Sequence, residues 1–192
     1  LTKGCTVFIP ICPFSSLAQT QAGAQWKRAD AEEEKGPMTP EEFRKSVAFL
    51  LGVWRREFGI ADFAEPLSER NRRTFEAKAV TLRKGLEACL ARGWRPILVM
   101  PPVSRYYDEV FSDKVWRQYV DDFVAAAHVE GVPYWDYGRD ERFRDDANFL
   151  NSLMLNRRGR VLFTKELVRR AADESSSAAF RRELRAFYPD EC

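Results

Sequence analysis

The sequence predicts an α/β fold, a three-layer sandwich in which helices cover both faces of a mainly parallel sheet. Three short apolar runs rich in β-branched residues recur along the 192-residue chain, at residues 5–11, 96–102 and 132–137. Between them lie longer segments that carry apolar residues at helical spacing. Strands that are apolar on both faces and that alternate with helices are typical of a parallel sheet.

The first predicted strand, residues 5–11, has Pro10 near its end and leads into a loop with Pro13. Before it, residues 1–4 read as the end of a helix with a glycine cap. We therefore expect the chain to begin inside a larger domain, with N-terminal strands of the same domain ahead of it. Residues 18–37 contain an acidic run and predict a long surface excursion.

Two helices are predicted between the first and second strands. The first begins at Thr39, where a capping residue is followed by Pro40 and then by Glu42 three residues after the cap. The second begins near Ser68 and runs to Gly93. Its expected buried stripe consists of Phe75, Ala79, Leu82, Leu86, Cys89 and Leu90.

The second strand, residues 96–102, closes on a double proline and is followed by a predicted loop over residues 103–107. A third helix is predicted from Ser112 to Gly131, before the third strand at residues 132–137. We divide the chain into residues 1–172, the later part of an α/β domain, and residues 173–192, a C-terminal helical tail.

Composition excludes several classes of function. With 31 Lys and Arg against 29 Asp and Glu, the net charge of +2 favours no nucleic-acid partner. No apolar run is long enough to span a membrane. A single histidine, His128, and the lack of a CxxC pair argue against a metal site. No glycine-rich phosphate loop is present, so no cofactor is expected.

The four cysteines, Cys5, Cys12, Cys89 and Cys192, read as free thiols. Together with the lack of a signal peptide in this sequence, they point toward a cytoplasmic location. A sharper alternative makes Cys12 a reactive thiol, because it follows the first strand.

Ligands of open α/β sheets bind beyond the carboxyl ends of the strands. The candidate cleft residues that follow the first two strands are Cys12, Ser15, Ser16, Ser104 and Tyr106. Tyr106 and Tyr107 either line a pocket mouth or pack within their loop. Asp136, at the end of the third strand, either acts as a base or caps the next turn.

The segment after the third strand reads Asn151-Ser-Leu-Met154-Leu155-Asn156-Arg-Arg-Gly159. Together with Pro101-Pro102 and the strand Tyr134-Trp-Asp-Tyr137, it resembles the C-terminal half of the SGNH (GDSL-like) hydrolase family, closest to its DltD and acyltransferase-like branch. In that family the block is Asp-x-x-His-Leu-Asn-x-x-Gly, and the Asp and His complete a triad with a serine from near the start of the domain.

The resemblance implies an ester hydrolase or O-acyltransferase acting through an acyl-serine. The Leu, Asn and Gly of the block fall on Leu155, Asn156 and Gly159, but the Asp and His positions fall on Asn151 and Met154. Met has no titratable proton, and the amide of Asn does not replace a carboxylate. The family nucleophile belongs before residue 1.

Three hypotheses follow. The first is an SGNH-like ester hydrolase or O-acyltransferase homologue, with a small-molecule or glycan ester as ligand and no activity in this chain alone. The second is a non-catalytic module of the same fold that binds a carbohydrate, an acyl group or a protein partner, with Asn151, Met154 and Asn156 in its cleft. The third is a thiol enzyme that uses Cys12. His128 lies toward the end of the predicted third helix, so we expect it at the opposite edge of the sheet.

Overall fold

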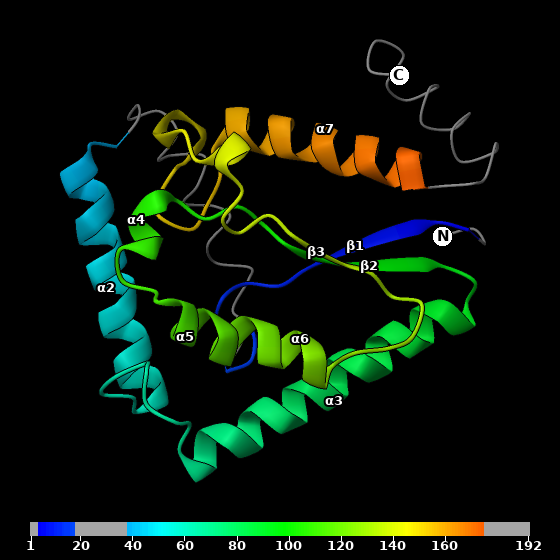
Figure 1. Cartoon of the computed structure of the whole chain (residues 1–192), viewed down its shortest axis with the longest axis horizontal. Helices are drawn as coiled ribbons and strands as arrows, with labels where there is room; N and C mark the ends of the chain where they lie inside the picture. The colour runs from blue at the N-terminus through cyan, green and yellow to red at the C-terminus, as the bar shows by residue number, and fades with distance from the viewer. Residues whose placement is uncertain (1–3, 18–37, 175–192) are drawn as a thin grey trace.

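Three parallel strands lie at the centre of the computed structural model, which describes residues 4–17 and 38–174 (Figure 1). They are β1 (Thr6–Pro10), β2 (Arg95–Met100) and β3 (Tyr134–Asp136), in the order β1-β2-β3. The register pairs Phe8 with Ile97 and Leu98 with Tyr134. The predicted α/β class and the parallel arrangement of these strands are confirmed.

Two long helices connect β1 to β2. In α2 (Pro40–Phe58), the Thr39 hydroxyl accepts a hydrogen bond from the Glu42 N–H while the Glu42 carboxylate accepts from the Thr39 N–H at 2.7 Å. This reciprocal pair is the predicted capping box. The helix ends at Gly59, whose φ of +63° is a left-handed conformation.

The second of these helices, α3 (Glu69–Ala91), begins after the cap Ser68 as predicted. Ala79 and Leu86 are buried along the predicted stripe. Leu90 is 36% exposed, so its assignment to that stripe was wrong. Leu90 shares the helical face of Leu86, but it is the last residue but one of α3, at an end of the helix where residues 90–93 are all exposed.

The predicted third helix is interrupted and shorter than expected. It consists of α5 (Asp113–Trp116), the π-helical turn η1 (Arg117–Asp121) and α6 (Asp122–Ala126). A π-helical turn is wider than an α-helical one and changes the phase of the side chains that follow it. Gly131, the predicted end, lies with a φ of +80° in the connection to β3.

The predicted loop after β2 instead contains a short helix, α4 (Arg105–Asp108). After β3 come the 3₁₀ turns η2 (Glu141–Phe143) and η3 (Asp146–Asn148), and then α7 (Arg157–Glu174). In Figure 1, α7 lies on one side of the sheet and α3, α5 and α6 lie on the other. The Arg170 guanidinium lies 4.4 Å from the centre of the Trp135 ring, so α7 packs on β3.

Helix α7 continues through Glu174, past the predicted boundary at residue 172. The expected excursion at residues 18–37 and the rest of the expected tail lie outside the described residues. Within the described residues, no helix combines the length and apolarity required to cross a bilayer.

Candidate functional site at the carboxyl edge of the sheet

The carboxyl ends of the three strands meet at one edge of the sheet, because the strands are parallel. They are Pro10, Met100 and Asp136. This edge is where open α/β folds bind ligands. The segments that follow the strands carry the candidate residues predicted from the sequence.

The turn after β1 places one candidate cysteine and two candidate serines. The Ser15 hydroxyl accepts a hydrogen bond from the Cys12 N–H at 2.7 Å. Ser16 is fully buried, and its hydroxyl has no partner among the described residues. Phe14 anchors this turn, with ring centres 4.4 Å from Trp54 and 4.8 Å from Tyr119. Ser15 is therefore committed to the turn.

After β2, Ser104 and Tyr106 are both buried. The Ser104 hydroxyl does not cap α4 and has no partner among the described residues. The Tyr106 hydroxyl donates to Asp146 Oδ2 at 2.8 Å, and Arg105 Nη2 donates to the same oxygen at 2.7 Å. The Tyr106 ring stacks on Phe43 at 5.0 Å with an interplanar angle of 10°. Packing therefore fixes Tyr106.

Asn151 and Met154 lie in one hydrogen-bonded turn. The Asn151 Oδ1 accepts from the N–H groups of both Leu153 and Met154 at 3.0 Å. The Met154 carbonyl accepts from the Leu150 N–H at 2.8 Å. The side-chain oxygen of Asn151 thus closes the turn on itself and holds no titratable partner in place.

This turn adjoins the end of β2. The Ser104 N–H donates to the Ser152 carbonyl at 3.1 Å. The Ser152 and Ser46 hydroxyl oxygens lie 3.3 Å apart, which joins the turn to α2. The structure therefore brings Ser104 together with the segment of Asn151 and Met154.

Asn156 and Gly159 start α7. Asn156 Oδ1 accepts from the Gly159 N–H at 3.0 Å, and Asn156 Nδ2 donates to the Ala147 carbonyl at 2.8 Å. A Cβ atom on Gly159 would lie 2.1 Å from the Asn148 carbonyl oxygen, so the backbone leaves no room for a side chain. Both residues have a structural role, as cap and as point of close approach.

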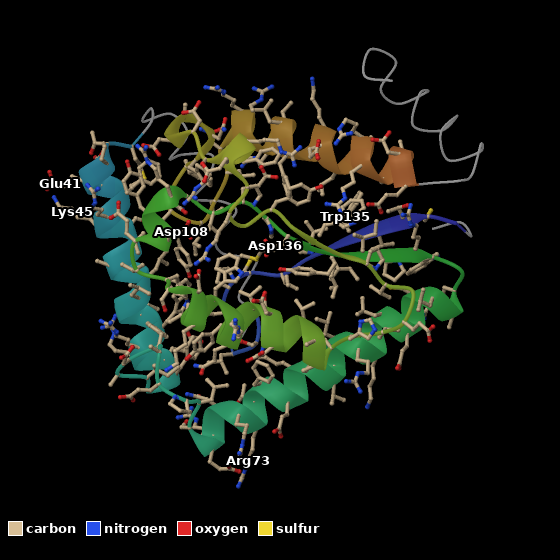
Figure 2. All side chains as sticks on the ribbon, in the orientation of Figure 1. Glu41, Lys45, Arg73, Asp108, Trp135 and Asp136 are labelled. Atoms are coloured by element: carbon tan, nitrogen blue, oxygen red, sulfur yellow. The ribbon has the colours of Figure 1, made fainter. Side chains whose placement is uncertain are left out.

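Helix α2 lies across this edge of the sheet (Figure 1). Its Phe43 packs on Tyr106, its Ser46 meets Ser152, and its Trp54 ring centre lies 6.2 Å from that of Tyr107. Figure 2 shows Glu41 and Lys45 on the outer face of α2, where their ion pair spans 2.7 Å. Helix α2 therefore covers this edge of the sheet. No local sequence pattern predicts these contacts.

The surroundings of Cys12 disfavour the thiolate form that a reactive cysteine needs. Desolvation raises the pKa of the Cys12 thiol, which disfavours the thiolate. Its residue surface is exposed. Desolvation also raises the pKa of the buried Tyr107, and charge on Cys12 raises it further.

His128 is exposed and follows α6, at the end of the molecule from which β3 starts. Asp136 lies at the opposite end of that strand, and its Oδ1 accepts from the Gly138 N–H at 2.7 Å. The topology thus separates the histidine from the candidate edge as predicted. Asp136 thus closes the turn at Gly138, whereas the turn at Glu141, which it was predicted to cap, is capped by Asp140.

Two charged clusters at this edge were missed by sequence analysis. Arg139 binds Asp108 at 2.9 Å, binds Asp113 at 2.6 Å and lies 4.8 Å over the Trp116 ring. Asp108 is the last residue of α4 and Asp136 is the last residue of β3, and both are labelled in Figure 2. Long-range pairs of this kind leave no local signal in a sequence.

The second cluster joins η1 to β3. The pKa of Asp121, the last residue of η1, is raised by desolvation first and then by the carboxylates of Asp136 and Asp122. Burial and the same Asp136 raise the pKa of Tyr134. In the described part of the chain, no three His, Cys, Asp or Glu side chains are arranged to hold a metal ion.

Comparison with known proteins identifies no relative. No family model matches the chain, and neither a curated protein nor a solved structure is significantly similar to it.

Proposed function

We propose that this chain is a homologue of SGNH-like ester hydrolases and O-acyltransferases that binds its ligand without turning it over. In this proposal the helices on both sides of the sheet form the sandwich of that family. The ligand belongs to the family's chemical class, an acyl group or an ester on a small molecule or glycan, and a protein partner is the alternative.

One contrast carries the proposal. The residues that agree with the family pattern, Asn156 and Gly159, build the start of α7. The residues at the two catalytic positions, Asn151 and Met154, close a turn by hydrogen bonds to each other's backbone. The scaffold part of the pattern is kept, and the chemical part is replaced by side chains that transfer no proton.

No other described side chain at this edge replaces the missing groups. Ser16 and Ser104 are fully buried, so their hydroxyls are not presented at the surface where an ester would bind. The Ser15 oxygen accepts from the Cys12 backbone, and the Cys12 thiol is held protonated by its raised pKa. A nucleophile needs both an adjacent base and access to substrate, and these residues lack that combination.

Catalysis is tested by incubating the chain with a fluorophosphonate probe and with a short-chain aryl ester. We expect no labelled serine and no hydrolysis above the buffer rate. The double variant Asn151→Asp/Met154→His is the matched control and is also expected to be inactive. Labelling of Ser15, Ser16 or Ser104, with turnover lost on changing that serine to Ala, would overturn the proposal.

Binding is tested separately by following backbone amide resonances during addition of glucose pentaacetate, a small glycan ester. We expect saturable shifts confined to residues 101–106 and 149–154. Shifts that spread over the surface without saturating, or none at these residues, would contradict ester binding at the sheet edge.

A further inference from the structure

A half-open groove with a volume of about 260 Å³ lies between α2 and the α4 segment. The two helices are neighbours at the end of the sheet (Figure 1). The groove is lined by apolar residues in its middle and charged residues at its rim: Arg44, Val47, Ala48, Leu51, Arg55, Tyr106, Glu109 and Val110.

The floor of the groove is apolar and rigid. Val47 and Leu51 are buried in the α2 interface, and Tyr106 is held by its stacking on Phe43. Val110 is 47% exposed at the rim, where it presents an aliphatic side chain to solvent. An aliphatic ligand would be removed from water against this floor and would cover Val110, because Val47, Leu51 and Tyr106 are themselves at most 8% exposed.

Of the two arginines that line the groove, one has a carboxylate partner and the other has none among the described residues. Arg44 is neutralised by a two-point contact with Glu109, at 2.9 and 3.0 Å. The Arg55 guanidinium lies 5.7 Å over the Phe63 ring and forms no ion pair with any residue that the structure describes. One positive charge without a carboxylate partner therefore stands beside the apolar floor.

We propose that this groove binds a short aliphatic carboxylate, with its chain along Val47, Leu51 and Val110 and its head group at Arg55. A single available guanidinium supplies the two parallel donors that one carboxylate accepts. The volume is below the roughly 300–1,000 Å³ of pockets that enclose drug-sized ligands, so the chain is short. The proposal goes beyond the function above and does not depend on ester binding at the sheet edge.

The first test titrates the whole chain with butanoate, hexanoate, octanoate and decanoate, following backbone amide resonances. Each added methylene is expected to strengthen binding by about fourfold until the groove is filled, after which affinity levels off. Octanol, which has no charge, is expected to bind more weakly than octanoate. Affinity that keeps rising with chain length, or shifts at the strand-end segments in place of the groove, would overturn the assignment.

The second test uses two matched pairs of variants with octanoate. Val110→Asp places a like charge at the rim and is expected to lower affinity at least tenfold, whereas Val80→Asp, at an equally exposed valine on α3, leaves it unchanged. Arg55→Gln is expected to weaken binding about two- to fivefold, the range of an exposed ion pair. Arg56→Gln is its control.

Equal effects of the two variants within either pair would refute binding of octanoate in the groove. A positive result here with no response to glucose pentaacetate would leave this site standing and remove ester binding at the sheet edge. The converse result would leave the proposed function standing and remove this site.

Discussion

The side-chain oxygen of Asn156 accepts a hydrogen bond from the Gly159 N–H at 3.0 Å, and this contact starts α7. The same asparagine donates through its amide nitrogen to Ala147, just before the helix approaches the Asn148 carbonyl. A cap and a close approach thus share one short sequence motif. Asn156 acts through its hydrogen bonds and Gly159 through its lack of a side chain, so the two effects on stability can be measured separately.

Replacing Gly159 by Ala is expected to destabilise the fold by about 1–3 kcal/mol, the usual cost of overpacking. The new Cβ would lie 2.1 Å from a backbone oxygen, which cannot rotate away as a flexible side chain would. The measurement is the free energy of unfolding in urea. Gly85→Ala, on α3 with nothing within 4 Å, is the control and is expected to stabilise by about 0.5–1 kcal/mol.

Replacing Asn156 by Ala removes both the cap acceptor and the donor to Ala147, and we expect a loss of about 1–2 kcal/mol in the free energy of unfolding. Asn156→Ser keeps a cap acceptor and loses the amide donor, so it is expected to cost less. If the two variants were equally stable, the capping bond would have no measurable value.

The raised pKa of Asp121 predicts a pH-dependent gain from Asp121→Asn. An acid whose pKa is raised in the folded state opposes folding when ionised, and this opposition disappears as the pH falls through the folded pKa toward the unfolded value of about 3.9. The variant is therefore expected to be more stable than the natural chain at pH 7, by at most about 1 kcal/mol because the site is partly solvated. Below about pH 4 the two are expected to converge.

The measurement for Asp121 is the midpoint of thermal unfolding across this pH range. A gain at Asp121 that persisted unchanged below pH 4 would show that the carboxylate charge is not its cause.

The Cys12 thiol is expected to react slowly. In a variant with Cys5, Cys89 and Cys192 changed to Ser, iodoacetamide at pH 7.5 is expected to alkylate Cys12 more slowly than a cysteine in a short peptide, because desolvation lowers the thiolate fraction. Unfolding the variant in urea is expected to restore the peptide rate. Faster reaction in the folded state would revive the thiol-enzyme hypothesis.

Local features of the fold were predictable where the signal was local. The capping box at Thr39 and Glu42 and the three apolar strands need only neighbouring residues, and the structure contains them. The π-helical turn at Arg117–Asp121 was missed, because the apolar spacing around it satisfies an ordinary helix equally well. The short helix α4 was missed because one helical turn is too brief to show a period.

The position of the candidate site at the strand ends was predictable from the sequence. The contacts that cover it were not. Parallel strands place Ser104 and Asn151 at one edge, and the contact of Ser104 with Ser152 follows that topology. The cover supplied by α2, with Phe43 against Tyr106, pairs residues far apart in the chain. Such contacts depend on packing of whole elements, for which a single sequence carries no direct signal.

The register of the sheet also bears on the order in which the chain folds. Thr6 pairs with Arg95, whereas Leu98 pairs with Tyr134, so joining β1 to the sheet closes a loop more than twice as long. Each doubling of loop length adds roughly 0.6 kcal/mol of closure entropy. The β2–β3 pair therefore forms at the smaller entropic cost, and the amides of β1 are expected to exchange with solvent first.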